Sequence, residues 1–155
     1  MHANTCAVAE ALARLAPEAE VRELAESTRT AADAAAALGC PLGAIANSLV
    51  FVAGGEPVLI MTSGAHRVDV DFAASAAGLP RLRRATADEV KEATGQPIGG
   101  VAPVGHRSTL RAFVDQDLAR HEVVWAAAGT PRSVFATTYD QLLAMTGGSA
   151  LQVTR

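Results

Sequence analysis

The stretch from Thr94 to His106, called the glycine loop below, combines residue types that suit a ligand-binding backbone. Its sequence Thr-Gly-Gln-Pro-Ile-Gly-Gly-Val-Ala-Pro-Val-Gly-His holds four glycines and two prolines in thirteen residues. Glycine lets a backbone approach a ligand or adopt positive φ, while proline fixes φ. We expect a stiff loop of exposed amides, suited to a carbonyl, ester or phosphate, because preorganised N–H groups stabilise developing negative charge.

Other catalytic motifs are missing from the sequence. The glycine spacing matches neither the P-loop nor the dinucleotide-binding fingerprint, since no Gly-Lys-Ser/Thr follows and the predicted helix precedes the loop. Gly-x-Ser-x-Gly, His-Glu-x-x-His and Cys-x-x-Cys are also absent, so serine-hydrolase and zinc-hydrolase chemistry lacks its parts. A purely structural, rigid connection remains the alternative interpretation of the glycine loop.

Caps, turn residues and apolar periodicity predict the elements that must position this loop. Helices are predicted over 4–14, with Asn4 or Thr5 as cap, over 31–38, with Thr30 as cap, and over 68–77 and 139–145. A further helix is predicted to begin at the capping box Thr86-Ala87-Asp88-Glu89. Strands are predicted over 21–24, 48–52, 58–61, 79–83, 110–114, 123–127 and 133–137. Because helices alternate with strands and Gly54-Gly55 joins a hairpin, we expect a mixed α/β or α+β domain with a curved, mostly antiparallel sheet.

Length and composition limit the remaining possibilities. The 155 residues fit one domain over 1–155, and half of them are apolar without a run long enough to span a bilayer. No signal peptide is recognisable, so we expect a cytoplasmic protein without a membrane partner. A net charge of −3 argues against sequence-independent binding to DNA or other long nucleic acid. Cys6 and Cys40 match no disulfide framework or metal pattern, and we expect neither metal nor cofactor.

Several sequence blocks, taken in order, resemble one known family. The segment Thr86–Gly105 is similar to the loop of the YbaK/prolyl-tRNA synthetase-associated editing domains, and the resemblance covers about residues 20–148. It implies a barrel-like mixed sheet flanked by helices. The other matching blocks are Ile45–Phe51, Ala112–Asp115, Ala127–Gly129 and Tyr139–Leu143.

The resemblance implies a stand-alone trans-editing deacylase, which hydrolyses mischarged tRNA, chiefly tRNA(Pro) carrying alanine, serine, threonine, cysteine or 2-aminobutyrate. Such an ester is already activated, so a pocket that binds the terminal adenosine, holds the carbonyl against loop amides and excludes bulky side chains could supply the acceleration. Editing is needed because a synthetase rejects a smaller side chain by only about 1–3 kcal/mol per methylene.

The resemblance also assigns candidate catalytic residues. Gly99, Gly100, Val101 and Pro103 match the family loop that faces the scissile ester, with Gly100 and Val101 as the expected N–H donors. Asn47 stands where most of the family has a lysine, which is expected to meet substrate phosphate or to orient the acceptor end. An amide donates hydrogen bonds but supplies no charge. Either this subgroup makes the contact differently, which we favour, or the protein binds without much hydrolysis.

Five further residues are candidates for substrate binding, each with a structural alternative. Ser48 could contact substrate or be satisfied by backbone, and His66 could line the pocket rim or serve a surface or capping role. His106 adjoins the glycine loop and could reach the same pocket. Asp115 matches a family aspartate but could equally cap a turn or helix. Gly129 resembles the glycine that ends a family strand near the pocket.

Scattered arginines could form a strip for the acceptor stem, because guanidinium forks suit phosphate. A solvated charged face explains them equally well. The strip would comprise Arg81, Arg83, Arg84, Arg107 and Arg111, with Arg29, Arg67 and Arg132 as possible additions.

The expected partner is aminoacyl-tRNA, with a synthetase as a further candidate, and no oligomeric state is predicted. Two other functions stay open: a non-catalytic module for charged tRNA or an adenosine-bearing ligand, and a hydrolase of small esters.

Overall fold

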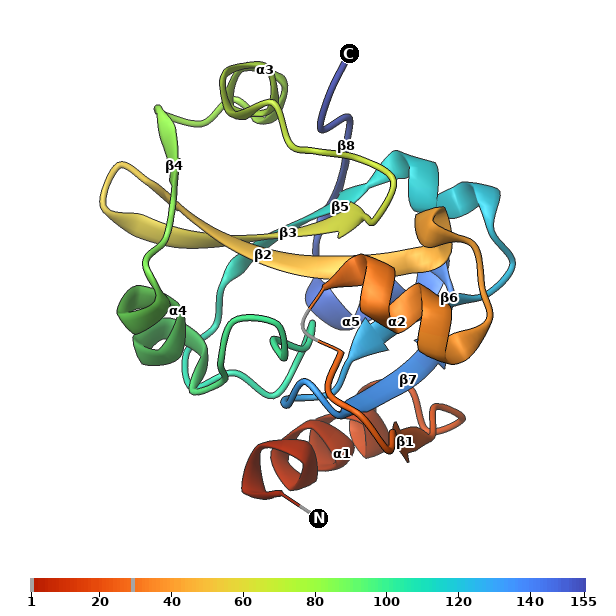
Figure 1. Cartoon of the computed structure of the whole chain (residues 1–155). Helices are drawn as coiled ribbons and strands as arrows, with labels where there is room; N and C mark the ends of the chain where they lie inside the picture. The colour runs from red at the N-terminus through yellow and green to blue at the C-terminus, as the bar shows by residue number, and fades with distance from the viewer. Residues whose placement is uncertain (1, 29) are drawn as a thin grey trace.

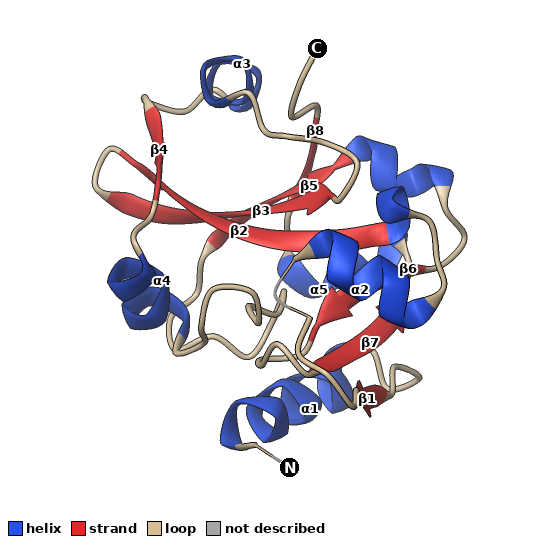
Figure 2. Ribbon diagram, in the orientation of Figure 1, coloured by secondary structure: helices blue, strands red, loops and turns tan. Residues whose placement is uncertain are grey.

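The computed structural model describes residues 2–28 and 30–155, so the predicted contribution of Arg29 lies outside the described residues. Its centre is one curved sheet flanked by helices (Figures 1 and 2). The strands are β1 Val21–Glu23, β2 Ile45–Ala53, β3 Glu56–Ser63, β4 Leu82–Arg84, β5 Arg111–Asp115, β6 Val124–Ala127, β7 Ser133–Thr137 and β8 Ser149–Leu151. The helices are α1 Ala3–Leu15, α2 Ala31–Leu38, α3 Val70–Ala77, α4 Ala87–Thr94 and α5 Tyr139–Thr146, with short 3-10 helices at Leu42–Ala44 and Gln116–Arg120.

The sheet mixes antiparallel and parallel pairing. Its strand order is β1-β7-β6-β2-β3-β5-β8, and β4 pairs with β2 outside that path. Antiparallel pairs join β1 to β7, β6 to β7, and β2 to both β3 and β4, whereas β2 pairs with β6, β3 with β5 and β5 with β8 in parallel. The predicted class, a mixed α/β domain with a curved sheet, is confirmed.

One edge of β2 is divided between two neighbours. The whole opposite edge pairs with β3, from Ala46 to Ala53. On the divided edge β6 pairs only with Ile45–Ala46 and β4 only with Phe51–Ala53. Among the described strands none covers the four residues between them, although the Val50 carbonyl accepts a hydrogen bond of 3.1 Å from the Ala85 amide. This uncovered stretch is called the β2 notch below.

Apolar side chains fill both faces of the sheet. On one face Val8 and Leu12 of α1 and Leu142 of α5 are buried in a cluster with side chains of the glycine loop. On the other face Ala73 and Ala74 of α3 pack in a second cluster with strand residues. Figure 1 shows α3 on the side of β2 and β3 opposite to α1 and α5. The helices are therefore fixed by burial rather than by propensity alone.

Most predicted helix ends are confirmed because they depend on local capping. Thr30 caps α2 through the Asp33 amide, and the capping box between Thr86 and Glu89 starts α4. The helix α1 is present as predicted, but its predicted cap is wrong: His2, whose side chain accepts a hydrogen bond from the Asn4 amide at 3.0 Å, is the cap. Asn4 and Thr5 lie inside this helix, where their side chains bond to other segments.

Two features follow from tertiary contacts and were not predicted. The strand β8 extends the sheet beyond β5, and β2 begins at Ile45, three residues before the predicted strand over 48–52. Across residues 2–28 and 30–155, no helix combines the length and the apolar character that a bilayer crossing requires.

Candidate active site

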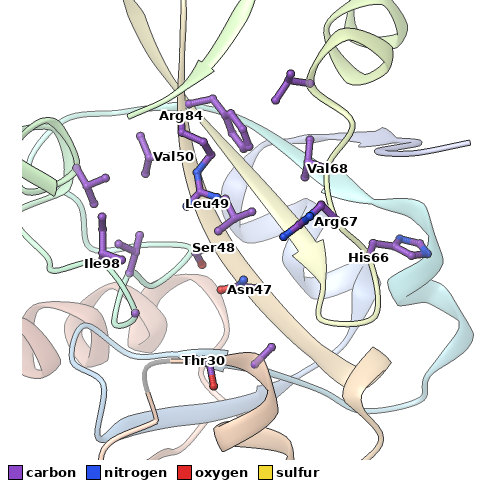
Figure 3. A pocket seen from close by; sticks show the side chains of 16 residues that line it. Thr30, Asn47, Ser48, Leu49, Val50, His66, Arg67, Val68, Arg84 and Ile98 are labelled. Carbon is purple, nitrogen blue, oxygen red and sulfur yellow. The ribbon is translucent and has the colours of Figure 1, made fainter. Parts of the chain in front are cut away.

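A cavity of about 480 Å³ opens at the β2 notch. The exposed edge of β2 forms its floor, while the N-terminus of α2, the β3–α3 connection, β4, α4 and the glycine loop form its walls (Figure 3). No aspartate or glutamate occurs among its described lining residues. They are Thr30, Ala31, Asn47, Ser48, Leu49, Val50, Phe51, His66, Arg67, Val68, Val70, Arg84, Val90, Ile98, Gly99 and Val101.

The glycine loop folds inward instead of standing exposed. Gly100, Val101, Ala102, Pro103 and Val104 are all buried, so the expectation of an exposed loop is wrong for this half of the segment. The loop folds inward because it buries apolar side chains: those of Val101, Ala102 and Val104 join the hydrophobic cluster that also contains residues of α1 and α5. The neighbouring stretch from residue 97 to 99 stays partly exposed, at the cavity.

Gly100 has a structural role in this fold. Its amide donates a hydrogen bond of 2.9 Å to the Pro97 carbonyl, so it is not available as the predicted oxyanion donor in this conformation. A Cβ at Gly100 would lie 2.6 Å from the Thr130 carbonyl carbon and 2.8 Å from the Pro131 nitrogen. Glycine is required there because two backbones pass too closely for any side chain.

The amides of Gly99 and Val101 are the remaining candidates for binding an oxyanion. Both residues line the cavity, and within residues 2–28 and 30–155 neither amide has a hydrogen-bond partner. Val101 is only 3% exposed, and a buried N–H without a partner costs free energy. An acceptor atom of a ligand would remove that cost, which makes these two amides suitable for a carbonyl oxygen.

Asn47 and Ser48 lie at the β2 notch, and both line the cavity. Asn47 is opposite Thr62 of β3, whose buried hydroxyl has no hydrogen-bond partner among the described residues. The Ser48 hydroxyl contacts the Met61 sulfur at 3.1 Å. A thioether is a weak acceptor, so this contact leaves the Ser48 hydroxyl able to bind a better one.

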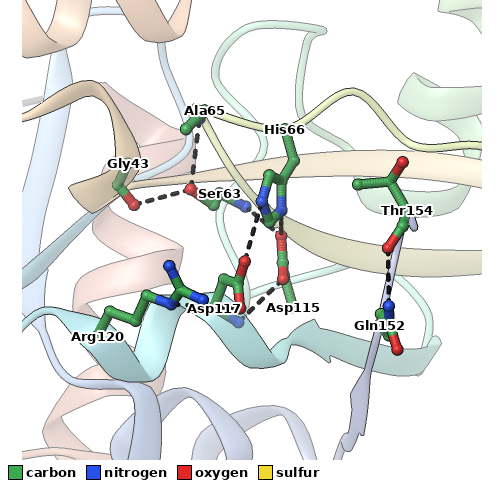
Figure 4. Close-up of polar contacts among 9 residues, drawn as sticks. All are labelled: Gly43, Ser63, Ala65, His66, Asp115, Asp117, Arg120, Gln152 and Thr154. Atoms are coloured by element: carbon green, nitrogen blue, oxygen red, sulfur yellow. Dashed lines mark hydrogen bonds and ion pairs between the residues drawn. The ribbon is translucent and has the colours of Figure 1, made fainter.

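His66 lines the cavity, but its ring is held by two carboxylates (Figure 4). Nδ1 lies 2.8 Å from Asp115 Oδ2, and Nε2 lies 3.0 Å from Asp117 Oδ2. Asp115 is 1% exposed and also accepts hydrogen bonds from the Ser63 and Asp117 amides. The aspartate predicted as a substrate ligand therefore caps a 3-10 helix and anchors the β3–α3 connection.

The same three side chains are the candidate metal ligands of the described chain. Ligand atoms of His66, Asp115 and Asp117 lie within 4.8 Å of one another. Both ring nitrogens, however, face carboxylate oxygens at hydrogen-bond distance, which a protonated imidazole satisfies on both sides. The geometry is that of an ion-pair network, and a metal ion would have to break it to bind.

The catalytic candidate Pro103 and the substrate-binding candidates His106 and Gly129 lie away from the main cavity. Pro103 and His106 line a separate groove on the far side of the glycine loop, against α1. His106 Nε2 is 2.6 Å from the Ala102 carbonyl, and burial lowers the pKa of its imidazole. Gly129 has φ of +101°, and a Cβ there would lie 2.8 Å from the Asn4 carbonyl oxygen, so it serves the packing of α1.

The predicted arginine strip is divided among several surfaces. Arg84 lines the main cavity, whereas Arg81 and Arg83 line a groove beside the β2–β3 hairpin. Arg83 is also bound bidentately by Glu89 at 2.8 and 2.9 Å. Of the remaining members, Arg107 shares a groove with Arg83, Glu89 and Glu92, Arg111 lies over the Phe113 ring at 5.2 Å, and Arg132 donates a hydrogen bond to the Ala25 carbonyl.

A smaller pocket of about 40 Å³ adjoins the cavity beneath α2. It shares Asn47, Ser48, Gly99 and Val101 with the larger space, so the two openings meet at the β2 notch and the glycine loop. Sequence inspection missed this pocket, because its lining comes from α2, β2, β6 and β7 together. The other lining residues include Ala34, Leu38, Ala46, Trp125, Ala127 and Val134.

The family model for the aminoacyl-tRNA editing domain matches residues 25–145, which include the cavity, the notch and the glycine loop. The chain belongs to the aminoacyl-tRNA editing domain family. The resemblance inferred from the sequence blocks is thereby confirmed, and the matched residues agree closely with the predicted extent.

Relatives of this editing domain occur both alone and within synthetases. The uncharacterized protein YwhH of Bacillus subtilis is 33% identical over 126 residues, which is 81% of this chain and 80% of that protein. The proline–tRNA ligase of Thiobacillus denitrificans is 34% identical over 115 residues, 73% of this chain but only 20% of the ligase. The ligase comparison therefore concerns a small part of that enzyme.

Solved structures share the fold over the whole chain. A crystal structure described as a candidate trans-editing enzyme for prolyl-tRNA synthetase is 43% identical, with a TM-score of 0.92, and covers 100% of this chain and 99% of the other. The hypothetical protein APE2540 is 28% identical with a TM-score of 0.84, covering 94% and 98% of the two chains.

Proposed function

We propose that this editing domain is a trans-acting aminoacyl-tRNA deacylase, and that its substrate is tRNA(Pro) carrying a small amino acid. The observation that supports this most directly is the pair of unpartnered amides at Gly99 and Val101, which line a cavity large enough for a nucleoside. The 43% identical structure, described as a candidate trans-editing enzyme for prolyl-tRNA synthetase, supports the same substrate class.

In this proposal the ester carbonyl binds against the Gly99 and Val101 amides. As water attacks, negative charge develops on the carbonyl oxygen, and fixed N–H dipoles stabilise it without reorganising. Asn47 and Ser48 lie on the floor of the cavity and can orient the ribose hydroxyl or the attacking water by hydrogen bonds. Gly100 and Pro103 hold the loop in shape, and the leaving group is the ribose hydroxyl of the terminal adenosine.

The amino acid side chain would enter the small pocket beneath α2. Its volume of about 40 Å³ accepts a group of one or two carbon atoms, and its walls are mostly apolar. Alanine, serine, cysteine and 2-aminobutyrate fit this description by size, whereas threonine, with three non-hydrogen side-chain atoms, would fit less readily. Proline, the correct amino acid, is bulkier and would be excluded, which gives selectivity by size.

A deacylation panel tests the proposal. The protein is incubated with tRNA(Pro) charged with alanine, serine, threonine, cysteine, 2-aminobutyrate or proline, and release of the amino acid is followed. We expect hydrolysis of at least one small amino acid and little hydrolysis of prolyl-tRNA(Pro). Binding of charged tRNA without turnover of any member would instead support the non-catalytic module, and turnover of small free esters without tRNA would support a general esterase.

A further inference from the structure

Two arginines approach the mouth of the cavity from different elements. Arg67 comes from the β3–α3 connection and Arg84 from β4. Both are exposed residues that line the cavity, and Figure 3 shows both side chains extending toward the stretch of β2 around Leu49. Segments that are separate in sequence thus bring two positive charges to one opening.

Neither guanidinium is neutralised by a carboxylate within the described chain. Arg84 lies over the Phe51 ring at 5.5 Å, which fixes its position without consuming its charge. The ion pairs of the described residues involve neither Arg67 nor Arg84, in contrast to Arg83, which Glu89 binds. In a chain of net charge −3, an opening with two free arginines and no acidic lining is a selective site for an anion.

Arg67 is positioned through its neighbour in the chain. His66 is clamped between Asp115 and Asp117, and Asp115 also binds the Ser63 amide, so both ends of the short segment before Arg67 are tied to the 3-10 helix after β5. An arginine on a fixed backbone loses less entropy when it binds phosphate than one on a free loop. The ion-pair network of His66, Asp115 and Asp117 therefore holds the backbone beside Arg67 in place before a phosphate binds.

We propose that Arg67 and Arg84 form a phosphate clamp at the cavity mouth, which binds the phosphate that joins the terminal adenosine to the rest of the tRNA strand. This inference rests on the proposed function, since it assumes an adenosine in the cavity. Guanidinium forks match phosphate oxygens in geometry and charge. The clamp supplies the positive charge that neutral Asn47 lacks, and it does so from two other elements of the fold.

Binding of two small probes tests the clamp without requiring turnover. Wild-type protein is titrated with adenosine and with adenosine 5′-monophosphate at low salt, and we expect the nucleotide to bind more tightly by on the order of tenfold. Arg67→Gln and Arg84→Gln should each reduce this preference several-fold, and the double variant should abolish it. Arg14→Gln, an exposed arginine on α1 that lines a different groove, should keep it.

The lysine variants Arg67→Lys and Arg84→Lys keep the charge and should retain part of the preference, which separates loss of charge from loss of fold. With charged tRNA, the double Gln variant should raise KM several-fold while kcat changes little, because the clamp binds ground state and transition state alike. Equal affinity of wild type for the two probes, or an unchanged preference in the double variant, would overturn the clamp.

The clamp and the proposed function fail in different ways. Hydrolysis of charged tRNA with an unchanged KM in the double variant would remove the clamp and leave the deacylase in place. A nucleotide preference that depends on both arginines, in a protein that hydrolyses no charged tRNA, would leave the clamp and remove the deacylase.

Discussion

The side-chain carbonyl of Gln96 accepts a hydrogen bond of 2.8 Å from the Ala102 amide, across the base of the glycine loop. The amide nitrogen of the same side chain donates to the carbonyls of Val104 and Gly105 at 3.4 and 3.2 Å. Gln96 is 1% exposed, so these bonds form in the protein interior, where the low dielectric strengthens them and makes them costly to break. One buried side chain thus fixes the loop whose residues Gly99 and Val101 line the cavity.

Replacing Gln96 by leucine should destabilise the protein and impair catalysis together. Leucine keeps most of the volume but leaves the buried Ala102 amide without its acceptor, which costs about 1–3 kcal/mol. The free energy of unfolding in urea measures that loss, and the deacylation rate reports the displaced loop. Gln152→Leu alters an exposed glutamine and should change neither quantity. Equal stability of Gln96→Leu and wild type would show that the hydrogen bonds of the Gln96 side chain do not hold the loop in place.

Gln96 also illustrates what the sequence could not predict. Its residue type favours an exposed position, and no neighbouring residue in the sequence indicates that its side chain forms hydrogen bonds with three backbone groups. The apolar residues that follow it, Val101, Ala102 and Val104, provide the one available signal, since a loop this apolar is more consistent with burial than with exposure. The expectation of exposed amides gave too little weight to that composition.

Local chemistry, in contrast, predicted the framework well. The hairpin at Gly54-Gly55, the caps at Thr30 and Thr86 and the strand over 133–137 all depend on neighbouring residues, and each is present. The β2 notch depends on where β4 and β6 stop pairing, and the His66–Asp115 contact joins residues 49 positions apart. Such features follow from tertiary packing, which patterns within a window do not contain.

The partly buried imidazole of His106 should make stability depend on pH. Burial lowers its pKa, an effect that its hydrogen bond with the Ala102 carbonyl partly offsets. As pH falls below about 6.5, the unfolded chain takes up a proton that the folded protein resists, so the free energy of unfolding decreases. The contribution of His106 to this decrease ends only when the pH is below the pKa of the imidazole in the folded protein.

Comparison of His106→Gln with wild type isolates this contribution. Unfolding in urea between about pH 7.5 and pH 5.5 should show a smaller decrease for the variant, because it lacks the titrating group. His121→Gln removes an imidazole from another part of the chain and serves as the control. An identical pH dependence of wild type and His106→Gln would contradict the assignment.

The ion pair between Arg83 and Glu89 should be visible in the acid titration of the protein. The Arg83 guanidinium, together with the Thr86 amide, lowers the pKa of Glu89 to about 2. Because this folded value lies below the ordinary one, the pair stabilises the fold above about pH 4.3, and that contribution is lost as the pH falls toward the folded pKa.

Arg83→Ala should raise the pKa of Glu89 substantially, though not to its full ordinary value, since the Thr86 amide still donates to the carboxylate. Carboxyl resonances followed by NMR during an acid titration measure the change. Arg81→Ala removes an arginine that forms no ion pair among the described residues, and Glu89 should titrate there as in wild type. An unshifted Glu89 in Arg83→Ala would show that the contact is not maintained in solution.

Filling the small pocket should change which amino acids are removed. Ala127 lines that pocket from β6, and valine at this position would add two methyl groups to a space of about 40 Å³. A side chain that no longer fits loses about 1–3 kcal/mol of transition-state binding per methylene. Ala127→Val should therefore lower kcat/KM for 2-aminobutyryl-tRNA(Pro) by on the order of tenfold more than for alanyl-tRNA(Pro).

The ratio of the two kcat/KM values is the decisive measurement, because a general loss of fold would lower both alike. Ala136→Val provides a matched control, since Ala136 lies on the paired strand β7, is partly exposed and does not line the pocket. Its ratio should equal that of wild type. If Ala127→Val also leaves the ratio unchanged, the amino acid side chain binds elsewhere, and selection by size would have to come from the larger cavity.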